Sequence, residues 1–104
     1  MFIPIYHICM NATWKAYNEA GIIAPDSLSD EGFTHFSFKE QVYSTIQRFF
    51  PEEDVVVLEI DPAKFDAEVK IEDLYQHGYF PHVYEHISTD AVIAVKQPQD
   101  FLNL

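Results

Sequence analysis

Residues 54–61, DVVVLEID, form the most distinct strand pattern in this chain. The run contains three consecutive valines, Val55, Val56 and Val57, and β-branched residues favour strands. An apolar run that does not alternate with polar residues is typical of a strand that is buried on both faces. We therefore expect residues 54–61 to form the central strand of a sheet.

The segment before this strand contains a strand, a helix and a stretch of turn-forming residues. Residues 2–8 are apolar with weak alternation, which predicts a first strand. Asn11 is a residue type that caps helices, and Gly21 is a type that ends them, so we expect a helix between these two residues. Residues 22–32, IIAPDSLSDEG, are rich in turn residues and predict a long loop, where functional groups are often found.

A second helix is predicted to begin at Ser37, directly after a short apolar strand that carries His35. Ser37 and Glu40 have the S-x-x-E spacing of a capping box. Apolar residues then follow at helical spacing, namely Phe38, Val42, Ile46 and Phe49. Pro51 is expected to end this helix, which would pack on the core.

Three further strand patterns follow the central strand, at residues 69–73, 82–88 and 91–97. In the first, Val69 and Ile71 are expected to point inward. In the second, alternation places His82, Tyr84 and His86 on one face. A short turn between the last two patterns favours a hairpin.

The order of these elements predicts an α+β fold. A strand, a helix, a strand and a helix precede about four strands, so we expect a mixed or antiparallel sheet with two helices on the N-terminal crossovers. A chain of 104 residues fits a single domain, residues 1–104. Its hydrophobic content of 48% suffices for a core that needs no stabilising cross-links.

The charge of the chain argues against two classes of partner. Six Lys and Arg residues stand against seventeen Asp and Glu residues, which gives a net charge of −11. An acidic surface repels phosphate backbones and anionic lipids, so we expect neither nucleic-acid nor membrane binding. Exposed aromatic residues such as Phe80 and Phe101 are compatible with a monomer or a weak homodimer.

Cysteine content and hydropathy predict a cytoplasmic protein. Cys9 is the only cysteine, so no disulfide forms within the chain, which suits a reducing compartment. The N-terminal residues lack a basic segment and are interpreted as a strand and not as a signal peptide. No apolar run approaches the roughly 20 residues of a membrane span.

Three histidines, His7, His35 and His82, lie in apolar segments that we predict as strands. Three imidazoles are a known ligand set for catalytic zinc, but their spacing does not support a metal site, and none is predicted. The alternative is that each is a core histidine whose ring bonds a backbone carbonyl. Cys9 lies two residues after His7, where a small buried hydrophobe is favoured over a nucleophile.

The chain resembles the bacterial domain-of-unknown-function family 952. The resemblance covers residue 5 to about residue 96. It is carried by IYHI (5–8), Trp14 in the first helix, SLSDEGFTHFS (27–37) with Gln41 following, VVLEIDPAKF (56–65) and FPHVYEHISTDAVIAV (80–95). That family is related by fold to ADP-ribosyltransferases and RNA 2′-phosphotransferases, so the resemblance implies an ADP-ribosylation-like fold with a cleft for NAD or a related nucleotide.

The resemblance also implies roles for individual residues. His7 is similar to the histidine that contacts ribose in one class of these transferases, and THFS (34–37) resembles a VHLS segment of the phosphotransferases. His35 would lie at the edge of the cleft, and the helix start at Ser37 would offer backbone donors to an anion. The implied ligand-binding residues are His7, His35, Ser37, His82 and Tyr84.

The departures from those enzymes leave three functions open. Arg48 is the only arginine, which disfavours 2′-phosphotransfer, and Glu85 is predicted on the face opposite His82. The favoured function is binding of a small nucleotide-like molecule in a cleft lined by His7, His35 and His82. The first alternative is an NAD-dependent ADP-ribosyl-type transferase, which requires an acid in the same cleft. The second is a non-enzymatic interaction protein with structural histidines.

Overall fold

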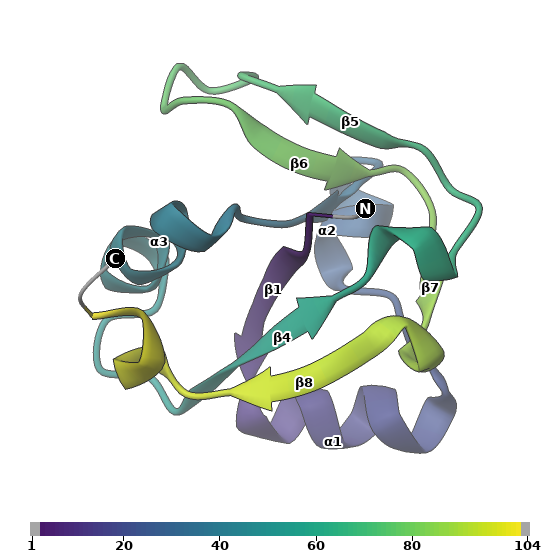
Figure 1. The fold of residues 1–104 in the computed structure, drawn as a ribbon, viewed down its shortest axis with the longest axis horizontal. Coiled ribbons are helices and arrows are strands. Elements are labelled where there is room, and N and C mark those ends of the chain that lie inside the picture. The colour runs from purple at the N-terminus through teal and green to yellow at the C-terminus, as the bar shows by residue number, and fades with distance from the viewer. Residues whose placement is uncertain (1–2, 103–104) are drawn as a thin grey trace.

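The computed structural model describes residues 3–102, and its first sheet is built around the predicted central strand. The sheet has the order β1-β4-β8, where β1 is Ile5–Met10, β4 is Val55–Ile60 and β8 is Val92–Lys96 (Figure 1). Both pairings are antiparallel. Val57 and Leu58, which point to opposite faces of β4, are both fully buried. The predictions of a central strand and of burial on both faces are confirmed.

A second three-stranded sheet lies beside the first. Its order is β3-β6-β5, with β3 at Thr34–His35, β6 at Phe80–Val83 and β5 at Val69–Glu72. A bridge between Tyr6 and Ser37 links the two sheets through a pair of backbone hydrogen bonds of 2.7 and 2.9 Å. In Figure 1 the β5–β6 hairpin forms the upper part of the molecule and the first sheet the lower part.

The helices occupy the N-terminal half of the chain, as predicted. They are α1 at Asn11–Ala20, α2 at Asp26–Asp30 and α3 at Val42–Phe49. Helix α1 follows β1, and α3 connects β3 to β4, so the α+β fold with helices on early crossovers is confirmed. The sheet pairings within residues 3–102 are all antiparallel. No helix in this part of the chain is long and apolar enough to cross a membrane.

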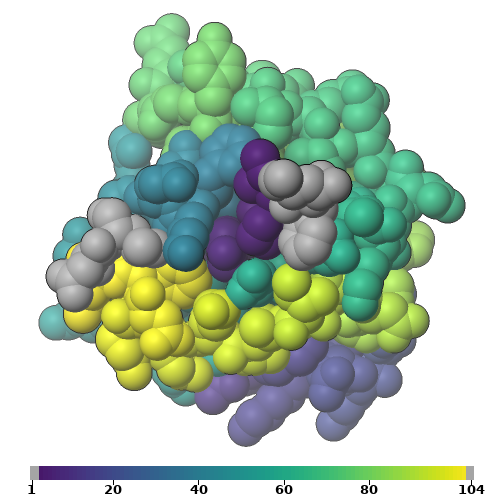
Figure 2. All heavy atoms as spheres, viewed as in Figure 1, coloured from purple at the N-terminus to yellow at the C-terminus, as the bar shows by residue number. Residues whose placement is uncertain are grey.

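The first sheet packs on both faces, which divides the core into two clusters. One face of β1 and β4 contacts Trp14 and Tyr17 of α1. The other face packs against Val42 and Ile46 of α3 and against Phe101, which belongs to a short C-terminal turn, Pro98–Phe101. Phe101 is buried, so the prediction that it is exposed is wrong. The space-filling view shows β8 and this turn across the lower front of the molecule, with α1 beneath them (Figure 2).

Residues 22–32 are more ordered than the sequence predicts. They contain β2, Ile22–Ile23, and the five-residue helix α2, so the prediction of a long loop is wrong. Strand β2 pairs with β7, Ile87–Ser88, which lies more than sixty residues later in the chain. A two-residue strand whose partner is that distant leaves little signal in the local sequence. The turn-forming residues of this segment instead form the short helix α2.

The start of the second helix also differs from the prediction. Ser37 is buried, and its backbone bridge to Tyr6 holds it in an extended segment, so it does not cap a helix. A short turn, Lys39–Gln41, begins two residues later and leads into α3. Gln41 accepts the Phe38 backbone N–H at 2.8 Å, so the side chain that caps this turn lies one position further along than predicted.

The C-terminal strands pair differently from the predicted hairpin. Strand β7 pairs with β2, and β8 pairs with β4. The predicted strand 82–88 is interrupted, because β6 ends at Val83 and Tyr84 to His86 lie in a bend. Ile71 of the edge strand β5 is exposed, which contradicts its predicted inward orientation. At the end of α1, Gly21 has φ +79° and its N–H donates to the Tyr17 carbonyl, as expected for a helix-ending glycine.

Candidate functional site

The two sheets border a cavity of about 920 Å³. Its wall is formed by β1, by residues around α2 and β3, by α3, and by the loop between β5 and β6. The lining combines apolar side chains such as Phe36, Leu74 and Phe80 with histidines and carboxylates. A concave site of this size with a few polar groups on an apolar wall is typical of small-molecule sites in proteins.

The pairing of β3 with β6 places two of the predicted histidines together. His35 and His82 are directly opposite each other in the antiparallel register. Their rings are 5.5 Å apart between centroids and nearly perpendicular. Phe33 packs against both rings, at 4.7 Å from His35 and 4.2 Å from His82. Two imidazoles that are forty-seven positions apart in the chain therefore share one wall of the cavity.

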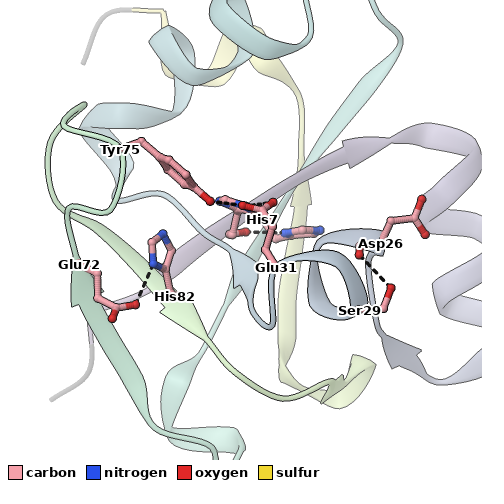
Figure 3. Close-up of polar contacts among 8 residues, drawn as sticks. His7, Asp26, Ser29, Glu31, Glu72, Tyr75 and His82 are labelled. Carbon is pink, nitrogen blue, oxygen red and sulfur yellow. Dashed lines mark hydrogen bonds and ion pairs between the residues drawn. The ribbon is translucent and has the colours of Figure 1, made fainter.

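Glu31 connects His35 to the loop between β5 and β6. Its Oε1 lies 3.0 Å from His35 Nε2, and its Oε2 accepts a hydrogen bond from the Tyr75 hydroxyl (Figure 3). The Tyr75 hydroxyl and then the His35 ring lower the pKa of Glu31, because both bonds favour the charged carboxylate. The same bond raises the pKa of Tyr75. Glu31 is therefore an ionised acceptor at neutral pH.

Glu72 has the same relation to the second histidine. Its Oε1 lies 3.0 Å from His82 Nδ1 and accepts a hydrogen bond of 2.6 Å from the Tyr84 hydroxyl. The Tyr84 hydroxyl and then the His82 ring lower the pKa of Glu72. In return, the Glu72 carboxylate raises the pKa of Tyr84 to about 12. Each histidine on this wall thus has a carboxylate on one ring nitrogen.

His7 is in a different environment from the other two histidines. It is buried on β1, and its Nδ1 lies 2.8 Å from the His35 carbonyl oxygen, to which a protonated Nδ1 donates. Burial lowers the pKa of His7 to about 4, so the ring is neutral at physiological pH. Its Nε2 is enclosed and has no hydrogen-bond partner among the described residues. This geometry matches the alternative interpretation, in which the histidine belongs to the core and its ring bonds a backbone carbonyl.

The predicted site residues are not equally placed. His7, His35, Ser37 and His82 all line the cavity. Tyr84 does not belong to the lining, and it contacts the site through Glu72 and Phe33. The Ser37 backbone N–H is bonded to the Tyr6 carbonyl at 2.7 Å, so the predicted role of Ser37 as an anion-binding helix start is wrong. The bridge between the two sheets uses the Ser37 backbone N–H, which is the donor that anion binding would require.

Several functional groups in the cavity were missed by sequence reasoning. Glu31 and Glu72 both line it, and neither is among the site residues that the sequence predicts. Tyr75 and His77 reach it from the loop between β5 and β6, and Arg48 of α3 lies 2.9 Å from His77 Nδ1. The position of Glu31, four residues before His35, is the one indication of these groups in the local sequence. The other groups are brought to the cavity only by the tertiary fold.

The described residues give no indication of a metal site or of a reactive thiol. Among residues 3–102, no three His, Cys, Asp or Glu side chains are grouped closely enough to hold a metal ion. Cys9 is buried, and burial raises the pKa of its thiol to about 12. A thiol in that environment is protonated at neutral pH, which fits the prediction of a small buried hydrophobe.

Comparison with known proteins identifies the family. Residues 8–95 match the family described as protein of unknown function, DUF952. The chain belongs to this family. The crystal structure of a second protein, CC0527 from Caulobacter crescentus, is similar, with a TM-score of 0.78, 26% sequence identity, and coverage of 97% of this chain and 99% of that chain.

The solution NMR structure of CC0527 gives a consistent result. Its TM-score is 0.73 and its identity 28%, with coverage of 96% of this chain and 97% of that one. Both structures were determined as structural-genomics targets. No curated protein matches the chain. The DUF952 fold is thus shared over nearly the full length of both proteins, and the site has to be interpreted from its own chemistry.

Proposed function

We propose that this DUF952 protein binds a small nucleotide-like molecule in the cavity between the two sheets. The observation that carries the proposal is the pair of histidine–carboxylate contacts, His35–Glu31 and His82–Glu72, on one wall of a 920 Å³ cavity. Polar groups that converge in an apolar pocket are the usual mark of a ligand site.

The lining offers a partner for each part of a nucleotide. Ionised Glu31 and Glu72 have spare acceptor capacity for ribose hydroxyls. The aromatic ring of Tyr75, which is exposed, offers a face for a base. Arg48 supplies a cation at the α3 side, where a phosphate would find a charge-assisted donor. The strong net negative charge of the chain favours ligands with few phosphates.

A second candidate function is NAD-dependent transfer of ADP-ribose. This function needs a carboxylate in the same cavity as His7, and Glu31 and Glu72 meet that requirement. Glu85 is exposed and outside the lining, so it does not take the role. The ADP-ribosylation-like fold that the resemblance implies remains part of this proposal.

The alternative of purely structural histidines applies best to His7. Its ring is buried, neutral and bonded to a backbone carbonyl. The side chain of His35 is different, because 43% of it is exposed and it bonds only the exposed carboxylate of Glu31. We propose that this exposed side chain contacts the ligand.

An NMR titration tests ligand binding directly. We would add adenosine, AMP, ADP-ribose and NAD separately to the labelled protein and follow the amide and imidazole resonances. Binding in the cavity predicts concerted shifts at His35, His82 and Tyr75 with at least one compound. If no compound moves these resonances, the proposal is wrong.

A matched pair of variants separates binding from folding. His35→Ala should abolish the shifts while changing the melting temperature little. His86→Ala is the control, because His86 is exposed and does not line the cavity. A large loss of melting temperature in His35→Ala, with no ligand found, would favour the structural interpretation. Release of nicotinamide during incubation with NAD would identify the transferase function instead.

A further inference from the structure

The two histidine–carboxylate contacts leave one nitrogen of each ring available. Glu31 and Glu72 are ionised acceptors, so the neutral His35 ring carries its proton on Nε2 and the neutral His82 ring on Nδ1. Each carboxylate therefore fixes one tautomer and leaves the opposite nitrogen, His35 Nδ1 or His82 Nε2, with a lone pair.

Both rings border the cavity. The His35 side chain is 43% exposed, whereas the His82 side chain is only 4% exposed and meets the cavity at its lining. In Figure 3 the nitrogen of His82 that does not contact Glu72 points toward the side where Tyr75 lies.

We propose that His35 and His82 act as a general acid–base pair that opens and closes the ring of a small reducing sugar, so that its two anomers interconvert. The proposal rests on ligand binding in this cavity and assigns it a reaction. Two imidazoles whose centroids are 5.5 Å apart suit proton transfer at neighbouring oxygens of one substrate. When one ring is neutral and the other protonated, the pair holds a base and an acid together.

The step balances without any further reactant. The neutral imidazole takes the proton of the anomeric hydroxyl, and the electrons of that O–H bond form the carbonyl of the open-chain aldehyde. The bond from the anomeric carbon to the ring oxygen breaks, and the ring oxygen takes its electron pair together with a proton from the other imidazole. Rotation about the adjacent carbon–carbon bond followed by the reverse transfers closes the ring as the other anomer, and both imidazoles return to their initial states.

The charges of the cavity favour a neutral, hydroxyl-rich substrate. Glu31 and Glu72 repel an anion placed beside the two histidines, whereas both accept hydrogen bonds from hydroxyl groups. Among the described lining residues, Arg48 is the one Lys or Arg side chain, and it already contacts His77. A free pentose matches this lining and is the sugar part of the ligand class proposed above.

The test measures the exchange between the anomers of D-ribose by NMR exchange spectroscopy with the whole protein. The wild-type chain should increase the exchange rate in proportion to protein concentration. His35→Gln and His82→Gln should each lower the protein-dependent rate at least a hundredfold, which is the usual contribution of a general acid or base. His86→Gln should keep the wild-type rate, because His86 is outside the cavity.

Glu72→Gln tests the positioning role of the carboxylate behind His82. It should lower the exchange rate, and long-range proton–nitrogen spectra should show that His82 no longer carries its proton on Nδ1 alone. An altered rate with an unchanged tautomer would contradict this role. Because His82 is buried, His82→Gln is first checked for folding, and if it does not fold, His35→Gln alone decides.

Two results would overturn the inference while leaving ligand binding intact. In the first, D-ribose or AMP shifts the cavity resonances but the wild-type protein does not accelerate exchange. In the second, acceleration persists in the folded His35→Gln variant. If D-ribose, adenosine, AMP, ADP-ribose and NAD all fail to shift any cavity resonance and no acceleration occurs, both the ligand-binding function and this reaction are wrong.

Discussion

Mild acid should destabilise this protein through His7. The buried His7 ring is neutral in the folded state, with a pKa of about 4, whereas the ordinary value is 6.5. In the unfolded chain the ring binds a proton as the pH falls below 6.5, but in the folded chain it does so only near pH 4. Between these values the unfolded state binds more protons, so the free energy of unfolding falls as the pH falls.

The size of the effect follows from the shift in pKa. The difference between 6.5 and about 4 corresponds to about 3 kcal/mol, at about 1.4 kcal/mol for each pH unit. Between pH 7 and pH 5 the loss should be about 2 kcal/mol. Glu31 and Glu72 have lowered pKa values, so their contribution is lost only below the ordinary glutamate value of 4.5. The His7 window therefore lies at higher pH than theirs.

Urea unfolding at several pH values from 7 to 4.5 measures this dependence. The variant His7→Asn removes the titrating ring and keeps an amide that can donate to the His35 carbonyl. It should be less stable at pH 7, because it leaves a void, but its stability should change by about 2 kcal/mol less than the wild type between pH 7 and pH 5. His86→Asn, at an exposed position, should keep the wild-type slope. Parallel curves for wild type and His7→Asn would refute the argument.

Three further outcomes are expected. Leu58→Ala, at a fully buried position of the central strand, should lower the free energy of unfolding by about 2–5 kcal/mol in urea titrations, whereas Ile93→Ala, on the exposed side of β8, should change it far less. Glu72→Gln should lower the pKa of Tyr84 from about 12 toward 10.0, which an NMR titration of its ring resonances measures, and an unchanged value would show that Glu72 is not the cause. Cys9, whose thiol pKa is about 12, should react with iodoacetamide at pH 8 only as fast as the chain unfolds, so rapid alkylation of the folded protein would contradict its burial.

Part of the site could be predicted because it depends on local sequence. The three histidines stand out as polar residues in apolar segments, and all three lie in strands that border the cavity. The sequence does not distinguish their environments, because His7 and His35 differ only in what packs around them. The ring of His7 bonds a backbone carbonyl, whereas the rings of His35 and His82 each contact a carboxylate. The partner that the fold brings to each ring, which spacing does not reveal, separates a structural histidine from a candidate functional one.

The misplaced residues have a common cause. Ser37 has the spacing of a helix cap, but a pair of backbone bonds to β1 is made instead, and Gln41 takes over the capping. Tyr84 alternates with His82 in the sequence, but β6 ends at Val83 and the alternation stops there. In both cases the local pattern is present in the sequence, but the folded backbone does not follow it.

The sequence by itself determined the elements whose signal is contained in a few consecutive residues. These are the buried valine-rich strand β4, the helix that ends at Gly21, and the α+β order of elements. Only the tertiary structure decided which strands pair and therefore which side chains meet. His82 faces His35 because β6 pairs with β3, and Glu72 contacts His82 because β5 pairs with β6. Pairing of distant strands is fixed by the packing of the whole core, so the two histidine–carboxylate contacts appear only once the chain has folded.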